Sequence, residues 1–176
     1  MEGQKTPLMT AFPHLPANVA ELLKKAREQN LDVIHIREQD LKDKSKWLPW
    51  WDRLHPPGGV GFGSLGEPEP WAKEIEGEVV FVKHTYDAFL SGVVSERLLA
   101  HLKEREIGRI FFAGALTKAC VMFTANSAFT HGFEVCVISD CCADRSKEDH
   151  DAALNLYNGY HIEVLGLPGA LSAMGC

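Results

Sequence analysis

The sequence predicts an α/β fold in which a mostly parallel sheet is covered by helices on both faces. Two observations predict it: segments with strand character alternate with amphipathic segments, and the strand segments are almost continuously apolar. Strands that are buried on both faces have this composition. At 176 residues and 45% hydrophobic, the chain is long enough to form a core of its own. We therefore expect a single domain over residues 1–176.

The predicted elements follow one another with few interruptions. Five strands share the apolar character and span residues 32–37, 78–84, 109–114, 134–139 and 160–165. The helices between them share an amphipathic or apolar stripe and span residues 18–29, 94–105, 117–131 and 147–158. Residues 1–16 contain three prolines and predict an irregular lead-in, after which Asn18 is expected to cap the first helix. Residues 38–77, which hold all four tryptophans, are expected to form a long loop excursion with one short helix.

Composition excludes several classes of partner. The net charge of −6 disfavours a phosphate-binding surface, so we expect no nucleic acid partner. No apolar run approaches the roughly 20 residues that span a bilayer, so we expect no membrane partner, and the first ten residues lack the apolar core of a signal peptide. The five cysteines form no C-x-x-C pair, which favours reduced thiols and a cytoplasmic location. The eight histidines show no metal-site spacing, so we expect no metal and no cofactor.

One glycine-rich stretch matches a nucleotide-binding pattern by its letters. Residues 61–66 read G-F-G-S-L-G, the spacing of a dinucleotide fingerprint. That fingerprint follows a strand and opens a helix, whereas here prolines and glycines precede it and E-P-E-P follows it. A nucleotide-binding module based on residues 61–66 is therefore the weakest functional hypothesis.

Cys120 is the strongest candidate for a nucleophile. It lies in the first turn of the helix that follows the strand over residues 109–114, where free backbone N–H groups and the helix dipole favour a thiolate. Thr117 has the chemistry to cap this helix, and the N–H groups of Leu116 and Cys120 are candidates for an oxyanion hole. The alternative is that Cys120 is a small core residue, since cysteines are often buried for packing alone.

Lys83 ends a second apolar strand. The carboxyl ends of parallel strands meet at one edge of a sheet, so Lys83 and Cys120 are expected at the same edge. There the ammonium group would hold the cysteine as a thiolate and orient a polar substrate group. The alternative is a lysine that simply reaches solvent. Asp140 also ends a predicted strand at this edge, where either substrate binding or a turn role fits.

Three stretches carry a family resemblance: V-V-F-V-K-H-T-Y-D-A-F at residues 79–89, G-A-L-T-K-A-C-V at residues 114–121, and V-I-S-D at residues 137–140 with Ser146 and His150 beyond. Their order resembles the isochorismatase-like cysteine hydrolases, which include isochorismatases, nicotinamidases and carbamoyl-amide hydrolases. The resemblance implies a three-layer α/β/α, Rossmann-like architecture, catalytic roles for Cys120 and Lys83, and a cis peptide between Ala115 and Leu116. It leads us to expect substrate contacts from Tyr86, Phe89 and Thr117.

The chain departs from the family at its start. Family members begin with a buried strand that ends in an aspartate, the general acid/base of the triad, but no aspartate precedes Asp32 here. We therefore expect the usual first strand to be missing. That strand would lie between the strands at 32–37 and 109–114. Without it, we expect these two strands to close up, or the gap to be filled by residues 8–12 or by a partner chain. A homo-oligomer is expected. The metal cluster of the nicotinamidases is absent from the sequence as well.

The sequence thus predicts an isochorismatase-like hydrolase in which Cys120 attacks a small amide, imide or vinyl-ether-type substrate. Loss of the aspartate removes the usual agent of proton transfer. General acid–base catalysis typically raises the reaction rate 10²–10⁴-fold, so weakened activity is expected unless another acid substitutes. The alternative is a catalytically impaired pseudoenzyme that acts in ligand binding or assembly.

Overall fold

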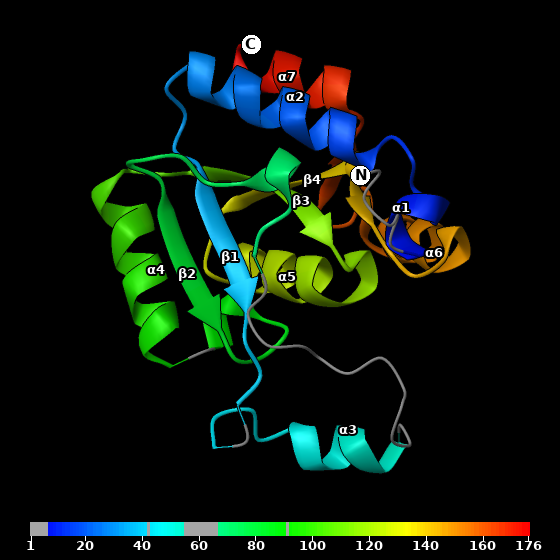
Figure 1. Ribbon diagram of the computed structural model, residues 1–176. Helices are drawn as coiled ribbons and strands as arrows, with labels where there is room; N and C mark the ends of the chain where they lie inside the picture. The colour runs from blue at the N-terminus through cyan, green and yellow to red at the C-terminus, as the bar shows by residue number, and fades with distance from the viewer. Residues whose placement is uncertain (1–6, 42, 55–66, 91) are drawn as a thin grey trace.

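The computed structural model describes residues 7–41, 43–54, 67–90 and 92–176 (Figure 1). The strands are β1 (Ile34–Glu38), β2 (Val79–Lys83), β3 (Arg109–Ala115), β4 (Glu134–Ala143) and β5 (Glu163–Leu165). The α-helices are α1 (Pro7–Ala11), α2 (Leu15–Glu28), α3 (Leu48–Leu54), α4 (Val93–Glu104), α5 (Met122–Thr130), α6 (Lys147–Tyr157) and α7 (Leu167–Met174). Shorter helical turns are η1 (Pro70–Ala72), η2 (Ala88–Leu90) and the π-helical turn η3 (Thr117–Val121).

All the strand pairs are parallel, as the alternation of apolar strands and helices predicted. β1 pairs with β2, with Glu38 opposite Lys83 in the register. β3 pairs with β4, and β4 pairs with β5. Because parallel strands require crossovers, each pair is connected through helical segments. The carboxyl ends of β1 and β2 therefore lie together, which brings the last side chains of both strands to one edge.

Helices cover the strands on two faces, so the fold has three layers. α2 and α7 lie together on one face, while α4 and α5 lie on the other (Figure 1). Two hydrophobic clusters reflect this division: Val135 and Val137 of β4 belong to the cluster beneath α4 and α5, whereas Ile138 belongs to the cluster beneath α2 and α7. A strand that is buried on both faces is apolar along its length, and this explains the composition of β4.

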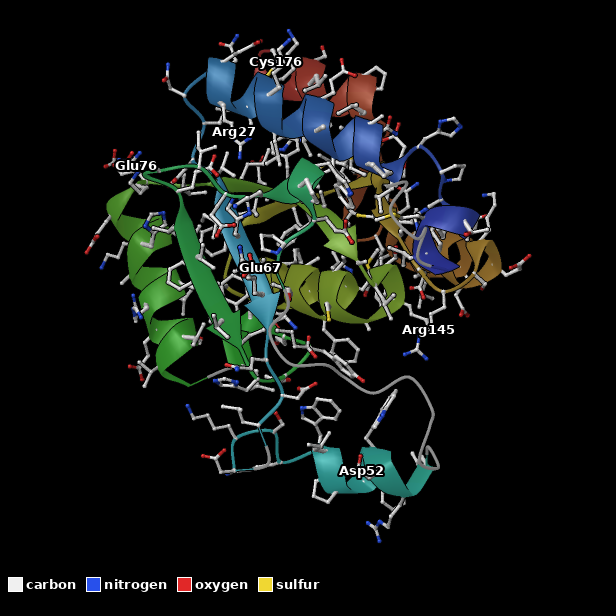
Figure 2. All side chains as sticks on the ribbon, viewed as in Figure 1. Arg27, Asp52, Glu67, Glu76, Arg145 and Cys176 are labelled. Atoms are coloured by element: carbon white, nitrogen blue, oxygen red, sulfur yellow. The ribbon has the colours of Figure 1, made fainter. Side chains whose placement is uncertain are left out.

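α2 is fixed to the start of β2 by an ion pair. Arg27 lies in the last turn of α2 (Figure 2), and its Nε and Nη2 atoms donate to the two carboxylate oxygens of Glu78 at 2.8 and 2.9 Å. This two-point hydrogen bond holds the pKa of Glu78 at about 2, despite the opposing effect of burial. His35 of β1 adds a contact to the same carboxylate at 2.8 Å.

The amino-terminal region differs from the prediction. Residues 7–11, predicted to be irregular, form α1, and α2 begins at Leu15 with Pro16 in its first turn, a position where proline's missing N–H costs nothing. Asn18 is therefore inside the helix and does not cap it. Its side-chain amide instead donates to the backbone carbonyl of Asp140 at 2.8 Å.

β4 is longer than predicted, which changes the role of Asp140. The strand continues through Ala143, because Cys141 and Cys142 are buried packing residues and not the start of a loop. Asp140 lies inside this strand, and its Oδ1 accepts the backbone N–H of Leu167 at 2.7 Å. Asp140 thus satisfies the amino-terminal end of α7, a helix that the sequence did not predict.

β1 and β3 do not pair with each other. β1–β2 and β3–β4–β5 form separate ladders among the described residues, so the two strands have not closed up. Residues 8–12 do not fill the space as a strand, since α1 takes up residues 7–11 and Phe12 packs edge-on against His150 at 5.0 Å. Both β1 and most of β3 are only partly buried, in contrast to β4.

Two further expectations concern segments at the margins of the fold. The excursion over residues 38–77 contains α3 and the turn η1 in its described part, whereas the glycine-rich stretch at 61–66 lies outside the described residues. Within the described ranges, none of the helices combines the length and the apolarity that a membrane crossing requires.

Truncating the core beneath α2 and α7 is expected to destabilise the fold. Ile138 is fully buried, so Ile138→Ala should lower the free energy of unfolding by about 2–5 kcal/mol through lost burial and a residual cavity. Leu156→Ala removes similar atoms from a side chain that is 69% exposed and should change stability by less than about 0.5 kcal/mol. Urea denaturation followed by circular dichroism measures both, and equal effects of the two substitutions would contradict the assignment of Ile138 to the core.

Candidate active site

Cys120 lies in the π-helical turn η3, directly after β3. The turn begins at Leu116, whose carbonyl accepts the N–H groups of Ala119 and Val121, both at 3.2 Å. The peptide bond between Ala115 and Leu116 is cis, as the family resemblance implied. Gly114 has a φ of +128°, a conformation open to glycine but rarely to other residues, and it lies where the register between β3 and β4 shifts. The backbone thus bends sharply just before the cysteine.

Lys83 lies at the carboxyl end of β2 and is only 3% exposed. Its Nζ donates to the carbonyl of Thr85 at 2.7 Å and approaches the Sγ of Cys120 at 3.4 Å. It also forms an ion pair with Glu38. A buried ammonium group needs such partners, because desolvation would otherwise favour its neutral form. The structure therefore brings Lys83 and Cys120 into contact, as their places at the strand ends predicted.

Glu38 is the third member of the cluster, and the sequence did not indicate it. It is the last residue of β1, opposite Lys83 in the ladder, and its Oε2 accepts a hydrogen bond from the Sγ of Cys120 at 3.0 Å. The predicted strand ended one residue earlier, so Glu38 was assigned to the loop excursion. An available signal was its charge at the carboxyl end of an apolar strand, where Lys83 also lies.

The electrostatic balance favours a protonated Cys120. Burial raises the pKa of its thiol most strongly; Lys83 opposes this effect, but Glu38 adds to it, and the pKa is raised to about 11. At neutral pH the sulfur is therefore a thiol that donates to a carboxylate. This differs from the thiolate that the helix-mouth position predicted, because burial of the sulfur, and then the charge of Glu38, outweigh the effect of Lys83.

Aromatic side chains gather beside the cluster. Tyr86 stacks at a tilt against Trp47 of the loop excursion, with ring centroids 5.2 Å apart, and against Phe123 of α5 at 5.8 Å. The Nε1 of Trp47 donates to the carbonyl of His84 at 3.2 Å. Burial, with added repulsion from Glu38 and Cys120, raises the pKa of Tyr86 to about 12. Tyr86, a predicted substrate contact, is therefore electrostatically close to the cluster.

The structure gives partners for the two other predicted substrate contacts, Phe89 and Thr117. Phe89 is part of the hydrophobic core in η2, where it packs against His131 and Phe133 at centroid distances of 5.2 and 6.3 Å. Thr117 is fully buried, and its hydroxyl pairs with His150 Nδ1 at 2.8 Å. It also does not cap the helix, since the capping position falls on Leu116. These contacts show that Phe89 packs in the core and that Thr117 is hydrogen-bonded to His150; a contact with the substrate stays a prediction for both.

A further carboxylate orders the backbone of the turn. The Oδ2 of Asp144, which is fully buried, accepts the N–H of Lys118 at 2.7 Å, and its Oδ1 accepts that of Arg145 at 2.7 Å. Asp144 thereby ties the end of β4 to the turn that carries Cys120. In the part of the chain that the structure describes, no three histidine, cysteine, aspartate or glutamate side chains are grouped closely enough to hold a metal ion.

Comparison with known proteins identifies the relatives of this chain. A sequence model of the isochorismatase domain matches residues 3–167. The chain is 34% identical over 110 residues to the isochorismatase family protein PncA of Bacillus subtilis, covering 58% of each chain. It is 32% identical over 78 residues to maleamate amidohydrolase of Pseudomonas putida, covering 44% of this chain and 35% of that protein. The alignments thus span less than two thirds of either relative.

The fold has close counterparts among solved structures. The crystal structure of an isochorismatase-like hydrolase from Alkaliphilus metalliredigens superposes with a TM-score of 0.76 at 21% identity, covering 93% of this chain and 86% of that chain. A similarity at this identity concerns the fold, and it agrees with the three-layer arrangement.

Alkylation of Cys120 by iodoacetamide is expected to be slow at neutral pH. Only the thiolate reacts, so a thiol pKa of about 11 predicts a rate that rises about tenfold per pH unit between roughly pH 6.5 and 9.5. A Cys176→Ser background removes the exposed cysteine, while Cys136, Cys141 and Cys142 are buried. Mass spectrometry of the modified peptide gives the rate. A rate that levels off below pH 8 would show that the resting sulfur is already a thiolate.

Proposed function

The chain belongs to the isochorismatase family, and we propose that it is a hydrolase that uses Cys120 to cleave a small amide. The observation that carries the proposal is the contact of the Cys120 Sγ with two oppositely charged groups, Lys83 at 3.4 Å and Glu38 at 3.0 Å. A sulfur so placed beside a proton acceptor and a cation matches the arrangement of an activated nucleophile.

The amide is the preferred substrate class for two reasons. The relative from Pseudomonas putida is named maleamate amidohydrolase, which supports amide cleavage over cleavage of an imide or a vinyl ether. The second reason is the site itself, since an amine leaving group needs a proton and the cluster holds ionisable groups next to the nucleophile. The aromatic side chains of Tyr86 and Trp47 would contact the apolar part of the substrate.

The reaction would proceed through a thioester. The sulfur attacks the amide carbon, and the carbonyl oxygen becomes an oxyanion that the N–H groups of Leu116 and Cys120 would stabilise. The C–N bond then breaks and the amine leaves. Water attacks the thioester, releases the carboxylic acid and restores the cysteine. Lys83 would stabilise the negative charge that develops on the sulfur whenever it is displaced from carbon.

A non-catalytic role is the second candidate function. The observation that favours it is the raised pKa of the Cys120 thiol, about 11, since a protonated sulfur is a poor nucleophile. Such a protein would retain the site for ligand binding or assembly. A turnover assay separates the two functions directly.

Location and assembly remain proposals. All five cysteines are free, which supports a reducing compartment such as the cytoplasm. A homo-oligomer would place a second copy against the exposed apolar side chains, among them Trp50, Leu90 and Val93. Light scattering of the purified chain measures the oligomeric state.

Replacing the nucleophile is expected to abolish turnover. A panel of small primary amides is screened for ammonia release, and Cys120→Ser should lower the rate on any accepted substrate by at least about 10³-fold, because a hydroxyl gives up its proton far less readily than a thiol and is the weaker nucleophile beside a carboxylate. Cys176→Ser changes an exposed cysteine in the same way and should leave the rate unchanged. Turnover that survives Cys120→Ser would contradict the proposed nucleophile, and absence of turnover by the parent protein across the panel would favour the non-catalytic role.

A further inference from the structure

We propose that Glu38 is the general acid and base of this site, transferring the proton between the Cys120 sulfur, the leaving amine and the attacking water. The proposal rests on the proposed function, the hydrolysis of an amide by Cys120. It assigns to β1 the task that the family's first strand would perform with an aspartate, and it predicts an active site complete within the described residues.

The geometry places the carboxylate on the reacting atom. The Oε2 of Glu38 accepts a hydrogen bond from the Cys120 Sγ at 3.0 Å and also forms the ion pair with Lys83. The distance to the sulfur is short enough for direct proton transfer without an intervening water. Because Glu38 lies opposite Lys83 in the β1–β2 ladder, its position is set by strand pairing and not by a flexible loop.

The second carboxylate oxygen provides an independent observation. The Oε1 of Glu38 is buried and accepts no hydrogen bond from any residue that the structure describes. A buried acceptor without a partner costs free energy and calls for an explanation, and a catalytic role is one such explanation. An ionised carboxylate has room for more than one donor, so Oε1 can accept the N–H of an amide while Oε2 holds the thiol.

Other carboxylates near the site are less suited to this role. Asp144 is fully engaged by the backbone N–H groups of Lys118 and Arg145. Asp40 is bonded to Ser45 at 3.3 Å, and burial, together with the charge of Glu38, raises the pKa of the Asp40 carboxyl. Glu38 is thus the acid that combines contact with the sulfur and an open acceptor.

In the first half-reaction, Glu38 carries one proton from the sulfur to the leaving nitrogen. The thiol proton of Cys120 passes to Oε2 as the S–C bond forms and the carbonyl electrons move to oxygen. When the oxyanion collapses, the C–N bond breaks and the proton passes from Glu38 to the departing nitrogen, which leaves as the amine. The products of this half are a thioester on Cys120 and an ionised Glu38.

The second half-reaction uses the same carboxylate as a base. Glu38 takes a proton from water while the water oxygen bonds to the thioester carbon. The C–S bond then breaks, the carboxylic acid is released, and the proton returns from Glu38 to the sulfur. The net reaction is amide plus water to acid plus amine, and no further reactant is needed. The ion pair with Lys83 keeps the carboxylate in place through both halves.

Several charged groups surround this carboxylate. On its own strand and the loop beyond lies Asp40, and from β2 and the segment after it come Lys83, His84 and Tyr86. Cys120 faces it from η3, and the charge of Arg145 acts on Tyr86 from beyond β4.

Replacing the carboxylate is expected to separate turnover from thiol reactivity. Glu38→Gln should lower the rate of amide hydrolysis by about 10²-fold or more, because the proton transfers lose their agent. The same change should speed alkylation of Cys120 by iodoacetamide several-fold at pH 8, since the Glu38 charge is one of the causes that raise the pKa of the thiol. A residue with a purely structural role would not move these two readouts in opposite directions.

Two further variants serve as controls. Glu74→Gln is the matched control, because Glu74 forms an ion pair with Arg37 of the same strand, and it should change neither readout. Glu38→Asp keeps the charge on a side chain one carbon shorter, so it should retain more turnover than Glu38→Gln and should still oppose the ionisation of Cys120. Because it also preserves a partner for Lys83, it tests the role even if Glu38→Gln folds poorly.

The outcomes distinguish this inference from the proposed function. Turnover in the parent protein that is unchanged in Glu38→Gln overturns the role of Glu38 and leaves Cys120 as nucleophile. A parent protein that cleaves no amide overturns the proposed function and, with it, this role. In that case, faster alkylation in Glu38→Gln would still establish the contact of the carboxylate with the sulfur, and unchanged alkylation would refute that contact as well.

Discussion

The candidate site depends on one buried ion pair, between Lys83 of β2 and Glu38 of β1. Removing either partner would leave a charge in a poorly solvated place, which is strongly unfavourable. Such a pair is weak evidence for stability, because the desolvation of both groups offsets their attraction. The ion pair matters here because it fixes the positions of its two groups. The pair fixes two ionisable groups at the carboxyl ends of adjacent parallel strands, where the Cys120 sulfur meets both of them.

The sheet architecture explains why three residues far apart in the sequence converge. Parallel pairing places the last residues of β1 and β2 side by side, and the sharp turn after β3 brings Cys120 to the same edge. The helices beneath supply the burial that strengthens these electrostatic contacts. Two buried residues hold the turn in place. Thr117 is hydrogen-bonded to His150, and Asp144 accepts the N–H of Lys118. The core residues thus position the site without touching its reacting atoms.

The sequence predicted the fold class correctly, because nearly continuous apolar strands alternating with helices permit few alternatives to a covered parallel sheet. It also predicted the meeting of Lys83 and Cys120, since both follow apolar strands. Glu38 was missed because the predicted strand ended at Arg37, one residue too early, and because the register that sets Glu38 opposite Lys83 is not fixed by composition. For Phe89 the sequence leaves the orientation open, since an aromatic residue after a strand can face a site or the core; in η2 its ring packs against Phe133.

The protonation state of Cys120 before the reaction determines which charges the site must hold. A site with a preformed thiolate would hold two anions, Cys120 and Glu38, against the single cation Lys83, and this repulsion is one reason why the thiol pKa is raised to about 11. One proton shared between sulfur and carboxylate relieves that conflict. In the proposed reaction the sulfur becomes negative only as it attacks, when Glu38 receives the proton and Lys83 faces a single developing anion. In that scheme Lys83 is already in place beside the charge that develops, and such preorganisation is what allows a site to stabilise a developing charge without reorganising its surroundings.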